Sequence, residues 1–393
     1  MPPDDDRSAE GTPGALAAIP EAPAPPETAP LVSAHAPGAP AESDVAAIHR
    51  LDDFEALARA KLPVDAFDYV AGGSWDEVTL AENVRAFRRR MLRPRVLVDV
   101  SSIDPSTTLL GTSVSLPVAL APTAFQSFAH PDAELAVARA AHEAGVLFAL
   151  STFSSASIEE VAAAGDAPRW FQLYANKDRA VTAALVERAT AAGYRAIVLT
   201  VDLPIPGYRE RDLRNGLRHP DRLGNVALER RDPGMVFQAT VAGFNDPALS
   251  WDDVPWLRGL SPLPLVVKGI MTAKDALLAA EHGAAAVVVS NHGGRQLDHV
   301  PATIDVLQEV TDAVAGSVEV YLDGGVRRAT DVLTALALGA RAVFVGRPYL
   351  YALAAGGEAG VARALAIMRV ELETAMALLG VRRPDEVTRA HVR

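Results

Sequence analysis

The chain has no cysteine among its 393 residues. This absence excludes disulfides, thiolate catalysis and metal centres built on cysteine ligands. No uninterrupted apolar run reaches the roughly 18 residues of a membrane span. The net charge of −12 argues against binding nucleic acid or anionic membranes by bulk attraction. We therefore expect neither partner, and we expect a cytoplasmic protein.

Residues 1–45 contain no aromatic side chain and show no hydrophobic periodicity. They are rich in proline and alanine, so they bury too little apolar surface to become ordered. Their acidic opening, Pro2–Asp6, lacks the basic start of a signal peptide and the arginines of a transit peptide. We predict a disordered tail over 1–45 and one large domain over 46–393.

Apolar residues recur at helical spacing in three segments near the start of this domain, which predicts helices over 45–61, 65–70 and 77–90. Tyr69 lies near the end of the second segment, shortly before Gly72 and Gly73. From the residues alone, this tyrosine reads as a core aromatic.

Eight short apolar segments then recur along the chain, each of strand length: 117–121, 146–150, 170–174, 196–201, 265–267, 285–289, 318–322 and 342–345. Helical patterns lie between most of them, at 132–144, 178–192, 272–282, 303–315 and 330–338. Alternating buried strands and helices indicate a parallel sheet covered by helices. Eight units in about 250 residues favour a (β/α)8 TIM barrel. A doubly wound sheet is the alternative, but no G-x-G-x-x-G opens a helix after the first strand.

The segment Ser290–Asp298 follows the sixth predicted strand and reads S-N-H-G-G-R-Q-L-D. His292 transfers protons near neutral pH, and Arg295 binds a carboxylate through two parallel hydrogen bonds. The pair suggests proton abstraction from a carboxylate-bearing substrate. On this segment alone, a glycine turn with two solvated side chains explains the pattern equally well.

The barrel prediction can be tested further, because catalytic residues of such barrels gather at the carboxyl ends of the strands. Polar side chains lie at all eight predicted strand ends: Thr123, Ser151, Gln172, Asp202, Lys268, His292, Asp323 and Arg347. The longest connection, residues 206–260, follows the fourth strand and is predicted to form an irregular lid. Arg209 at its base is a candidate second contact for the carboxylate.

The cofactor is suggested by the seventh and eighth strand ends. Their glycines, with Arg327 and Arg347, match the phosphate site that barrels often build there. Lys268 at the fifth strand end would stabilise an anion forming on a ring system. The remaining histidines show no metal-ligand spacing, so no metal is expected. A phosphorylated, conjugated cofactor for a carboxylate substrate suggests FMN.

The chain resembles the FMN-dependent 2-hydroxy-acid oxidase and dehydrogenase family from about residue 51 to residue 392. The motifs that carry the resemblance are Ser290–Asp298, Asp323–Arg327, Gly346–Pro348, Pro122–Ala124, Phe171–Tyr174 and Thr200–Asp202.

By position, the resemblance implies that His292 is the base and that Asp202 supports its charged form. It implies that Arg295, Arg209 and Tyr69 bind the substrate, that Tyr174 contacts its hydroxyl, and that Lys268 faces the flavin ring. The cofactor would also contact Ala121, Pro122, Thr123, Ala124, Ser151, Gln172, Thr200 and Ser290 around the ring, and Asp323, Gly324, Gly325, Arg327, Gly346 and Arg347 around the ribityl phosphate.

The implied reaction oxidises an (S)-2-hydroxy acid to the 2-oxo acid, with oxygen as acceptor and hydrogen peroxide as product. His292 takes its proton from the α-carbon in a carbanion route or from the hydroxyl in a hydride route. Alternatives are a dehydrogenase with another acceptor, an isopentenyl-diphosphate-type isomerase on the same fold, and a barrel without catalysis. The family also implies a homo-oligomer, a tetramer or octamer.

Several positions depart from the plant glycolate oxidases of this family. Phe153 and Phe125 stand where those enzymes have tryptophan and methionine, while Val70 and Tyr208 replace tyrosine and arginine. Asn176 is expected to reach the pocket. These changes would admit a larger side chain, so the choice between aliphatic and aryl acids stays open.

Overall fold

The computed structural model describes residues 45–220, 222–226 and 237–393. Of the predicted tail, only Val45 lies among them, so the disorder of residues 1–44 stays a prediction. The described chain forms the predicted barrel.

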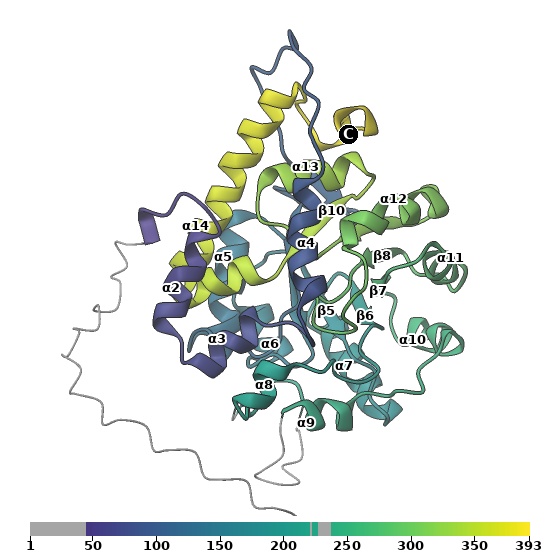
Figure 1. Cartoon of the computed structure of the whole chain (residues 1–393). Coiled ribbons are helices and arrows are strands. Elements are labelled where there is room, and N and C mark those ends of the chain that lie inside the picture. The colour runs from purple at the N-terminus through teal and green to yellow at the C-terminus, as the bar shows by residue number, and fades with distance from the viewer. Residues whose placement is uncertain (1–44, 221, 227–236) are drawn as a thin grey trace, which may run out of the picture. The chain divides into compact units, whose positions relative to one another are not determined.

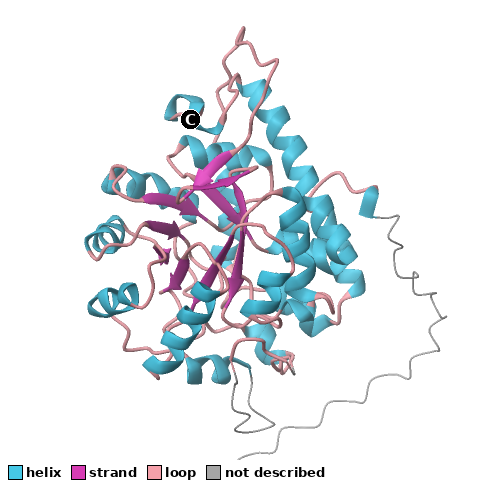
Figure 2. Ribbon diagram, turned by 180° about the vertical axis from the view of Figure 1, so that it is seen from behind, coloured by secondary structure: helices cyan, strands magenta, loops and turns pink. Residues whose placement is uncertain are grey.

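Eight parallel strands close into a barrel in the order β10-β3-β4-β5-β6-β7-β8-β9 (Figure 2). Their bounds are β3 Val118–Leu120, β4 Phe148–Ser151, β5 Arg169–Leu173, β6 Ile197–Thr200, β7 Leu265–Ile270, β8 Ala286–Val289, β9 Glu319–Leu322 and β10 Ala342–Val345. All eight predicted strands are confirmed, and the doubly wound alternative is wrong.

Side chains alternate between two cores along the strands, because successive residues of a strand point to opposite faces. In β3, Val118 and Leu120 pack in the layer between strands and helices, whereas Ala119 belongs to the barrel interior. The interior is filled by an aromatic cluster in which Trp170 lies 5.4 Å from Tyr321 and 5.9 Å from Phe344 between ring centroids. The barrel is therefore a packed core and not a pore.

Helices cover the outside of the barrel (Figure 1). Five were predicted, and they are found as α5 Ala133–Ala144, α7 Arg179–Ala191, α11 Ala273–Glu281, α12 Thr303–Val314 and α13 Ala329–Ala337. Gly145 and Gly339 follow such helices with φ of 65° and 102°, in the left-handed region that glycine adopts without steric cost. A short helix, α6 Ile158–Ala163, was not predicted.

A hairpin that the sequence did not reveal, β1 Thr107–Leu109 with β2 Thr112–Val114, closes the amino-terminal end of the barrel. Leu109 and Val114 pack into the barrel interior. Arg341, just before β10, donates to the carbonyl of Thr108 at 2.8 Å, and Glu319 at the start of β9 accepts from the Leu110 amide at 3.1 Å. The hairpin is thus tied to two strand beginnings.

Between residue 47 and the barrel, the chain forms the helices α2 Asp53–Lys61, α3 Val64–Ala71 and α4 Val78–Arg88. The helix predicted over 45–61 is interrupted, because Val45 and Ala46 are helical but α2 begins only at Asp53. Ile48 and Leu51 are buried as the periodicity indicated. Arg363, however, donates to the carbonyl of Ile48 at 2.9 Å, a group that a continuous helix would use internally.

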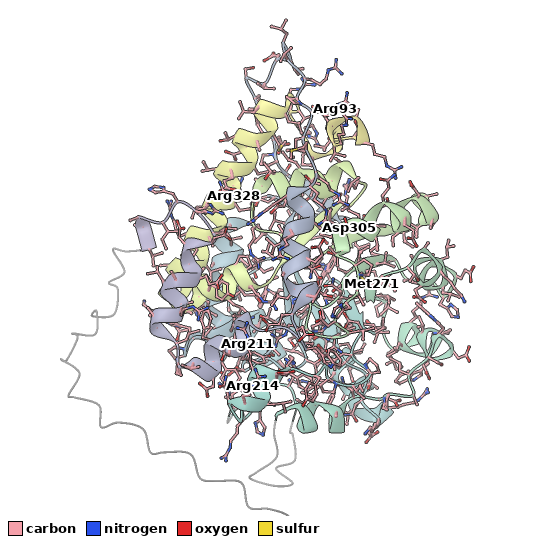
Figure 3. The ribbon with its side chains drawn as sticks, viewed as in Figure 1. Arg93, Arg211, Arg214, Met271, Asp305 and Arg328 are labelled. Carbon is pink, nitrogen blue, oxygen red and sulfur yellow. The ribbon has the colours of Figure 1, made fainter. Side chains whose placement is uncertain are left out.

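The excursion after β6 is more regular than predicted, since it contains α8 Glu210–Arg214, α9 Phe237–Phe244 and α10 Val254–Gly259. Residues 221 and 227–236 of the predicted lid lie outside the described part. The base of the excursion is fixed by Arg211 (Figure 3). Its guanidinium bonds to Asp68 of α3 at 3.4 Å and to Glu77 at 2.5 Å.

The carboxyl-terminal helix α14, Arg347–Leu379, packs against α5 and α2 (Figure 1). Gly356 and Gly357 interrupt it with non-helical backbone angles. By length and composition alone, α14 is long and apolar enough to cross a membrane, although it contains no uninterrupted apolar run of that length. Its most apolar stretch is 67% buried in the protein, as in the core helix of a globular domain.

Candidate active site

The carboxyl ends of the strands surround a cavity of about 1020 Å³, its opening included. Sixteen of the sequence-predicted site residues line it: Tyr69, Ala121, Pro122, Thr123, Ala124, Tyr174, Arg209, Lys268, His292, Arg295, Asp323, Gly324, Gly325, Arg327, Gly346 and Arg347. The other five do not line it and lie at strand ends nearby: Ser151, Gln172, Thr200, Asp202 and Ser290.

His292 and Asp202 form a hydrogen-bonded pair at the cavity, although they come from the loops after β8 and β6. The imidazole Nδ1 lies 2.8 Å from Asp202 Oδ1. The backbone of His292 has a φ of 57°, and its amide donates to Ser290 Oγ at 3.1 Å. An Nδ1–H bonded to the carboxylate leaves Nε2 able to accept a proton.

The electrostatics keep this pair as a neutral imidazole beside a carboxylate. Burial lowers the pKa of His292 and outweighs the opposing effect of Asp202, so the net pKa is below 6.5. Burial raises the pKa of Asp202, but the nearby His292 and Lys268 more than offset it, and the net shift is downward. A proton acceptor is therefore available at neutral pH.

Two guanidinium groups, those of Arg209 and Arg295, line the same cavity. Arg209 is only 6% exposed, and its Nη1 lies 3.5 Å from Asp212 Oδ2. Burial, followed by the proximity of Arg295, lowers the pKa of Arg209. A buried cation and a half-buried cation that line one cavity create a site for an anion, which would relieve their repulsion.

Two tyrosines complete this side of the cavity. The guanidinium of Arg295 stands 4.8 Å from the ring centre of Tyr69, and its Nη1 donates to the Tyr69 carbonyl at 2.7 Å. Burial raises the pKa of both Tyr69 and Tyr174. Both phenols therefore stay protonated and can donate hydrogen bonds to a ligand.

Lys268 supplies a buried positive charge at the end of β7. Its ammonium bonds to Ser290 Oγ at 2.9 Å and to Asp323 Oδ2 at 3.2 Å. Burial lowers the pKa of Lys268, but Asp323 and Asp202 outweigh this, so the net pKa is raised. The lysine thus remains charged despite being 5% exposed.

The polar atoms at the strand ends fit a heteroaromatic cofactor with hydrogen-bonding edges. Gln172 Nε2 and Thr200 Oγ1 are buried and have no hydrogen-bond partner among the described residues. Gln172 is oriented by Ser151, whose hydroxyl lies 3.2 Å from its Oε1. Since buried polar groups are rarely left without a partner, these two atoms match the edge of a flavin ring.

The glycines after β9 and β10 fit the phosphate end of the same cofactor. Gly324 and Gly325 have φ of 90° and 87°, and a side chain on Gly325 would collide with the carbonyl of Asn83. Arg327 lines the cavity beside them. Arg347 also lines it, while its guanidinium donates to the carbonyls of Val70, Gly72 and Gly293.

The structure also explains the other members of the Ser290–Asp298 motif. Asn291 exchanges two amide hydrogen bonds of 2.8 and 2.9 Å with Asn83 of α4. Asp298 accepts from the amides of Val78 and Thr79 at the start of α4. These hydrogen bonds therefore attach the loop that carries His292 and Arg295 to α4.

An aromatic wall that contains Phe125, Phe153 and Tyr174 borders the cavity. Phe153 stacks on Phe125 with ring centres 5.9 Å apart and on Tyr174 at 5.3 Å. Phe244 of α9 contacts Phe153 edge-on at 5.1 Å. Asn176, which was expected to reach the pocket, instead donates to the carbonyl of Phe244 at 2.9 Å and does not line the cavity.

Sequence reasoning missed Glu134, a fully buried carboxylate on α5. It accepts from the amides of Gln126 at 3.3 Å, Ser155 at 3.0 Å and Ala156 at 3.1 Å, and so joins the two loops that carry Phe125 and Phe153. Burial raises its pKa. No sequence signal marked it, because glutamate in the first turn of a helix is commonplace.

Comparisons with known proteins agree with this site. A family model described as FMN-dependent dehydrogenase matches residues 58–393. Glycolate oxidase of Spinacia oleracea is 51% identical over 352 residues, which cover 88% of this chain and 95% of that protein. Glycolate oxidase 3 of Arabidopsis thaliana is also 51% identical, over 87% of this chain and 95% of that protein.

A crystal structure of mandelate oxidase with (S)-4-hydroxymandelic acid superposes with a TM-score of 0.84 at 43% identity, over 88% of this chain and 98% of that chain. Both the sequence relatives and this structural neighbour cover nearly the whole described domain. The chain therefore belongs to the FMN-dependent dehydrogenase family, and it is an FMN-dependent enzyme that oxidises 2-hydroxy acids.

Proposed function

We propose that the protein is an (S)-2-hydroxy-acid oxidase whose substrates carry an apolar side chain, with molecular oxygen as electron acceptor. The substrate becomes the 2-oxo acid, and oxygen takes up its two electrons and two protons as hydrogen peroxide. The observation that carries this proposal is a neutral His292, bonded to Asp202, in a cavity that also contains Arg209 and Arg295.

We assign the substrate carboxylate to Arg209 and Arg295, because paired guanidiniums bind carboxylates with defined geometry. Tyr69 would contact the carboxylate from α3, and Tyr174 would donate to the substrate hydroxyl. These contacts would turn the α-carbon and its hydroxyl toward Nε2 of His292. Binding of the anion would also offset the charge of two adjacent cations.

His292 acts as the base in either chemical route, taking a proton from the α-carbon or from the hydroxyl. Asp202 then stabilises the imidazolium, as a carboxylate on the other ring nitrogen does in general. FMN, when bound, accepts the two electrons of the substrate. Lys268 presents a fixed positive charge where negative charge would accumulate, and its bonds to Ser290 and Asp323 hold it there.

The FMN contacts remain part of this proposal. Gln172, Thr200 and the segment Ala121–Ala124, with Ser151 and Ser290 behind them, would hold the ring. Asp323, Gly324, Gly325, Arg327, Gly346 and Arg347 would hold the ribityl phosphate. Arg347 would then exchange some of its carbonyl partners for phosphate oxygens.

The aromatic wall supports a substrate larger than glycolate. Phe125 and Phe153, which stand where plant glycolate oxidases have methionine and tryptophan, form two stacked rings against which an alkyl or phenyl side chain would bury its apolar surface. Each buried methylene contributes about 0.8 kcal/mol, so the preference over glycolate should be large. The names of the similar glycolate and mandelate oxidases support oxygen as acceptor.

The test is an anaerobic absorbance titration of the yellow protein with glycolate, (S)-lactate, (S)-2-hydroxyoctanoate and (S)-mandelate. We expect the flavin band to be bleached by the apolar acids at lower concentration than by glycolate, and (R)-mandelate to have no effect. Admitting air should restore the band and release hydrogen peroxide. A band that stays bleached in air would refute oxygen as acceptor, and a band that no acid bleaches would refute the reaction.

We also propose that the protein assembles into a homo-oligomer of four or eight copies. Trp75 and Tyr208 support this, because both are large, exposed aromatic residues with ring centres 6.2 Å apart, and Leu297 on an adjoining loop is exposed as well. Light scattering of the purified protein should give the mass of a tetramer or octamer, and a monomeric mass at micromolar concentration would refute the proposal.

A further inference from the structure

Gln296 lies next to Arg295 but does not line the cavity, and it is 8% exposed. Its side-chain amide makes three hydrogen bonds to a single segment, the loop after β6. Nε2 donates to the carbonyls of Asp202 at 2.8 Å and Ile205 at 3.0 Å. Oε1 accepts from the amide of Gly207 at 3.1 Å. Two donors and one acceptor are thus matched, which fixes the orientation of the amide.

The two loops joined by this amide divide the site between them. The loop after β6 provides Asp202 and leads into Arg209, while the loop after β8 provides His292 and Arg295. Asp202 and His292 therefore belong to different loops, and so do Arg209 and Arg295. Their geometry therefore depends on how the two loops are held together.

The backbones of these loops approach each other directly. A side chain on Gly207 would come within 2.3 Å of the Arg295 carbonyl and 2.9 Å of the Gln296 Cα. Glycine is required here because any side chain would push the loops apart. We call the contact between the loops after β6 and β8 the seam. Gln296 bridges the seam through its side-chain hydrogen bonds, and no strand pairing joins the described residues of these two loops.

The guanidiniums of Arg209 and Arg295 line the same cavity and repel each other. The hydrogen bonds across the seam therefore act against this repulsion. A neutral amide suits this place better than a charged group. A carboxylate would face two carbonyl oxygens, and an ammonium would add a third cation and could not accept from Gly207.

We propose that Gln296 is the positioning residue that sets Arg209 of one loop against Arg295 of the other. It thereby fixes the spacing of the two guanidiniums for the substrate carboxylate. This inference rests on the proposed function, which assigns that carboxylate to the two arginines.

The experiment compares the wild type with Gln296→Met, which keeps the length of the side chain but removes all three hydrogen bonds. The reduction of bound flavin is followed anaerobically with a 2-hydroxy acid and with its methyl ester, which lacks the negative charge. A matched control is Gln308→Met, the same substitution on the exposed face of α12. Flavin content and melting temperature are recorded for each variant.

We expect the wild type to favour the acid strongly over the ester. In Gln296→Met the specificity for the acid should fall about 10- to 100-fold, as expected for guanidiniums misplaced by about 1 Å. The ester should react nearly as in the wild type, and the 2-oxo acid should bind more weakly. Gln308→Met should behave as the wild type.

A Gln296→Met protein that retains the acid-to-ester preference would overturn the proposal. So would an equal loss for acid and ester, because a general loss of structure has that effect. If Gln296→Met does not accumulate as a yellow protein, Gln296→Asn applies the same test, since its amide is one methylene too short to span the seam. A wild type without preference for the acid would instead refute the carboxylate assignment in the proposed function.

Discussion

The two ends of the barrel are built from the same eight strands, but they bury opposite kinds of side chain. At the amino-terminal end, Leu109 and Val114 of the β1–β2 hairpin close an interior filled by Trp170, Tyr321 and Phe344. At the carboxyl-terminal end, many of the buried or half-buried side chains are charged or titratable, beside the aromatic wall that contains Phe125 and Phe153. Among them are His292, Asp202, Lys268, Asp323 and Arg209.

The amino-terminal end of the barrel, the closed end, thus contributes mainly to stability. The carboxyl-terminal end, the open end, carries the chemistry. Apolar burial at the closed end contributes stability without any requirement for pairing. Burial of charge at the open end costs free energy unless each charge has partners, and here the partners are other site residues. Removing one partner would leave a buried charge unpaired, so the open end depends on complete pairing, whereas the closed end does not.

Substitution of the base should have the largest effect. In His292→Asn, flavin reduction by substrate should slow by about 100- to 10,000-fold, because the proton acceptor is lost. FMN should remain bound and the melting temperature should change little, since asparagine tolerates the backbone φ of 57°. Anaerobic stopped-flow absorbance measures the rate.

A matched control is His299→Asn, because His299 is exposed and has a similar φ of 58°. That variant should reduce its flavin at the wild-type rate. If His292→Asn were reduced at nearly the wild-type rate too, the assignment of the base would be wrong.

At the closed end, Leu109→Ala should change stability and leave the chemistry intact. Truncating this fully buried side chain should lower the free energy of unfolding by about 2–5 kcal/mol, measured by urea denaturation. The exposed Leu378 provides the control, since Leu378→Ala should cost no more than about 0.5 kcal/mol. A slower flavin reduction in folded Leu109→Ala protein would show that the two ends are coupled.

The pH dependence of flavin reduction should be set by His292 at the open end of the barrel. Because the pKa of His292 lies below 6.5, its neutral form should persist to mildly acidic pH. The rate of flavin reduction at low substrate should therefore stay constant near neutrality and fall only below pH 6.5. The histidine also stabilises the fold above its unfolded pKa, and this contribution is lost as pH falls through the folded pKa.

Asp202→Asn should move this acidic limb to still lower pH, since Asp202 raises the pKa of the imidazole. The maximal rate should fall as well, because the imidazolium loses its support. An acidic limb at or above pH 6.5 in the wild type would contradict a neutral, buried base.

The smallest effect is expected for an exposed ion pair outside the closed end. Arg383 Nη1 lies 3.2 Å from Asp104 Oδ2, and both side chains are about half exposed. Water and salt screen such a pair, so Asp104→Asn should leave both the melting temperature and the rate unchanged. A clear drop in melting temperature would mean that this loop helps to hold the hairpin in place.

Much of the fold followed from local patterns. Buried strands such as 285–289 and helices such as 303–315 were predicted because burial on both faces and burial on one face leave different periodicities. The hairpin 107–114 was not, since its three-residue strands are too short to show a period. The start of α2 was predicted wrongly, because the backbone before it is held by a contact with Arg363, more than 300 residues away.

The candidate site was predicted in the same uneven way. His292 and Arg295 could be predicted because their residue types indicate proton transfer and carboxylate binding, and because their segment follows a strand. Glu134 and Gln296 did not, although each holds two loops together through three hydrogen bonds. Glutamate and glutamine are common surface residues, and only their partners distinguish them from solvated ones.

By itself, the sequence determined the order of strands and helices, the glycine turns and the residues able to move a proton or bind an anion. These properties are local, since they depend on side-chain type and spacing. Only the tertiary structure decided which loops meet, that His292 pairs with Asp202, and that burial leaves the imidazole neutral. Barrel closure brings together residues that lie 90 positions apart, and a pKa depends on the surroundings that this closure creates.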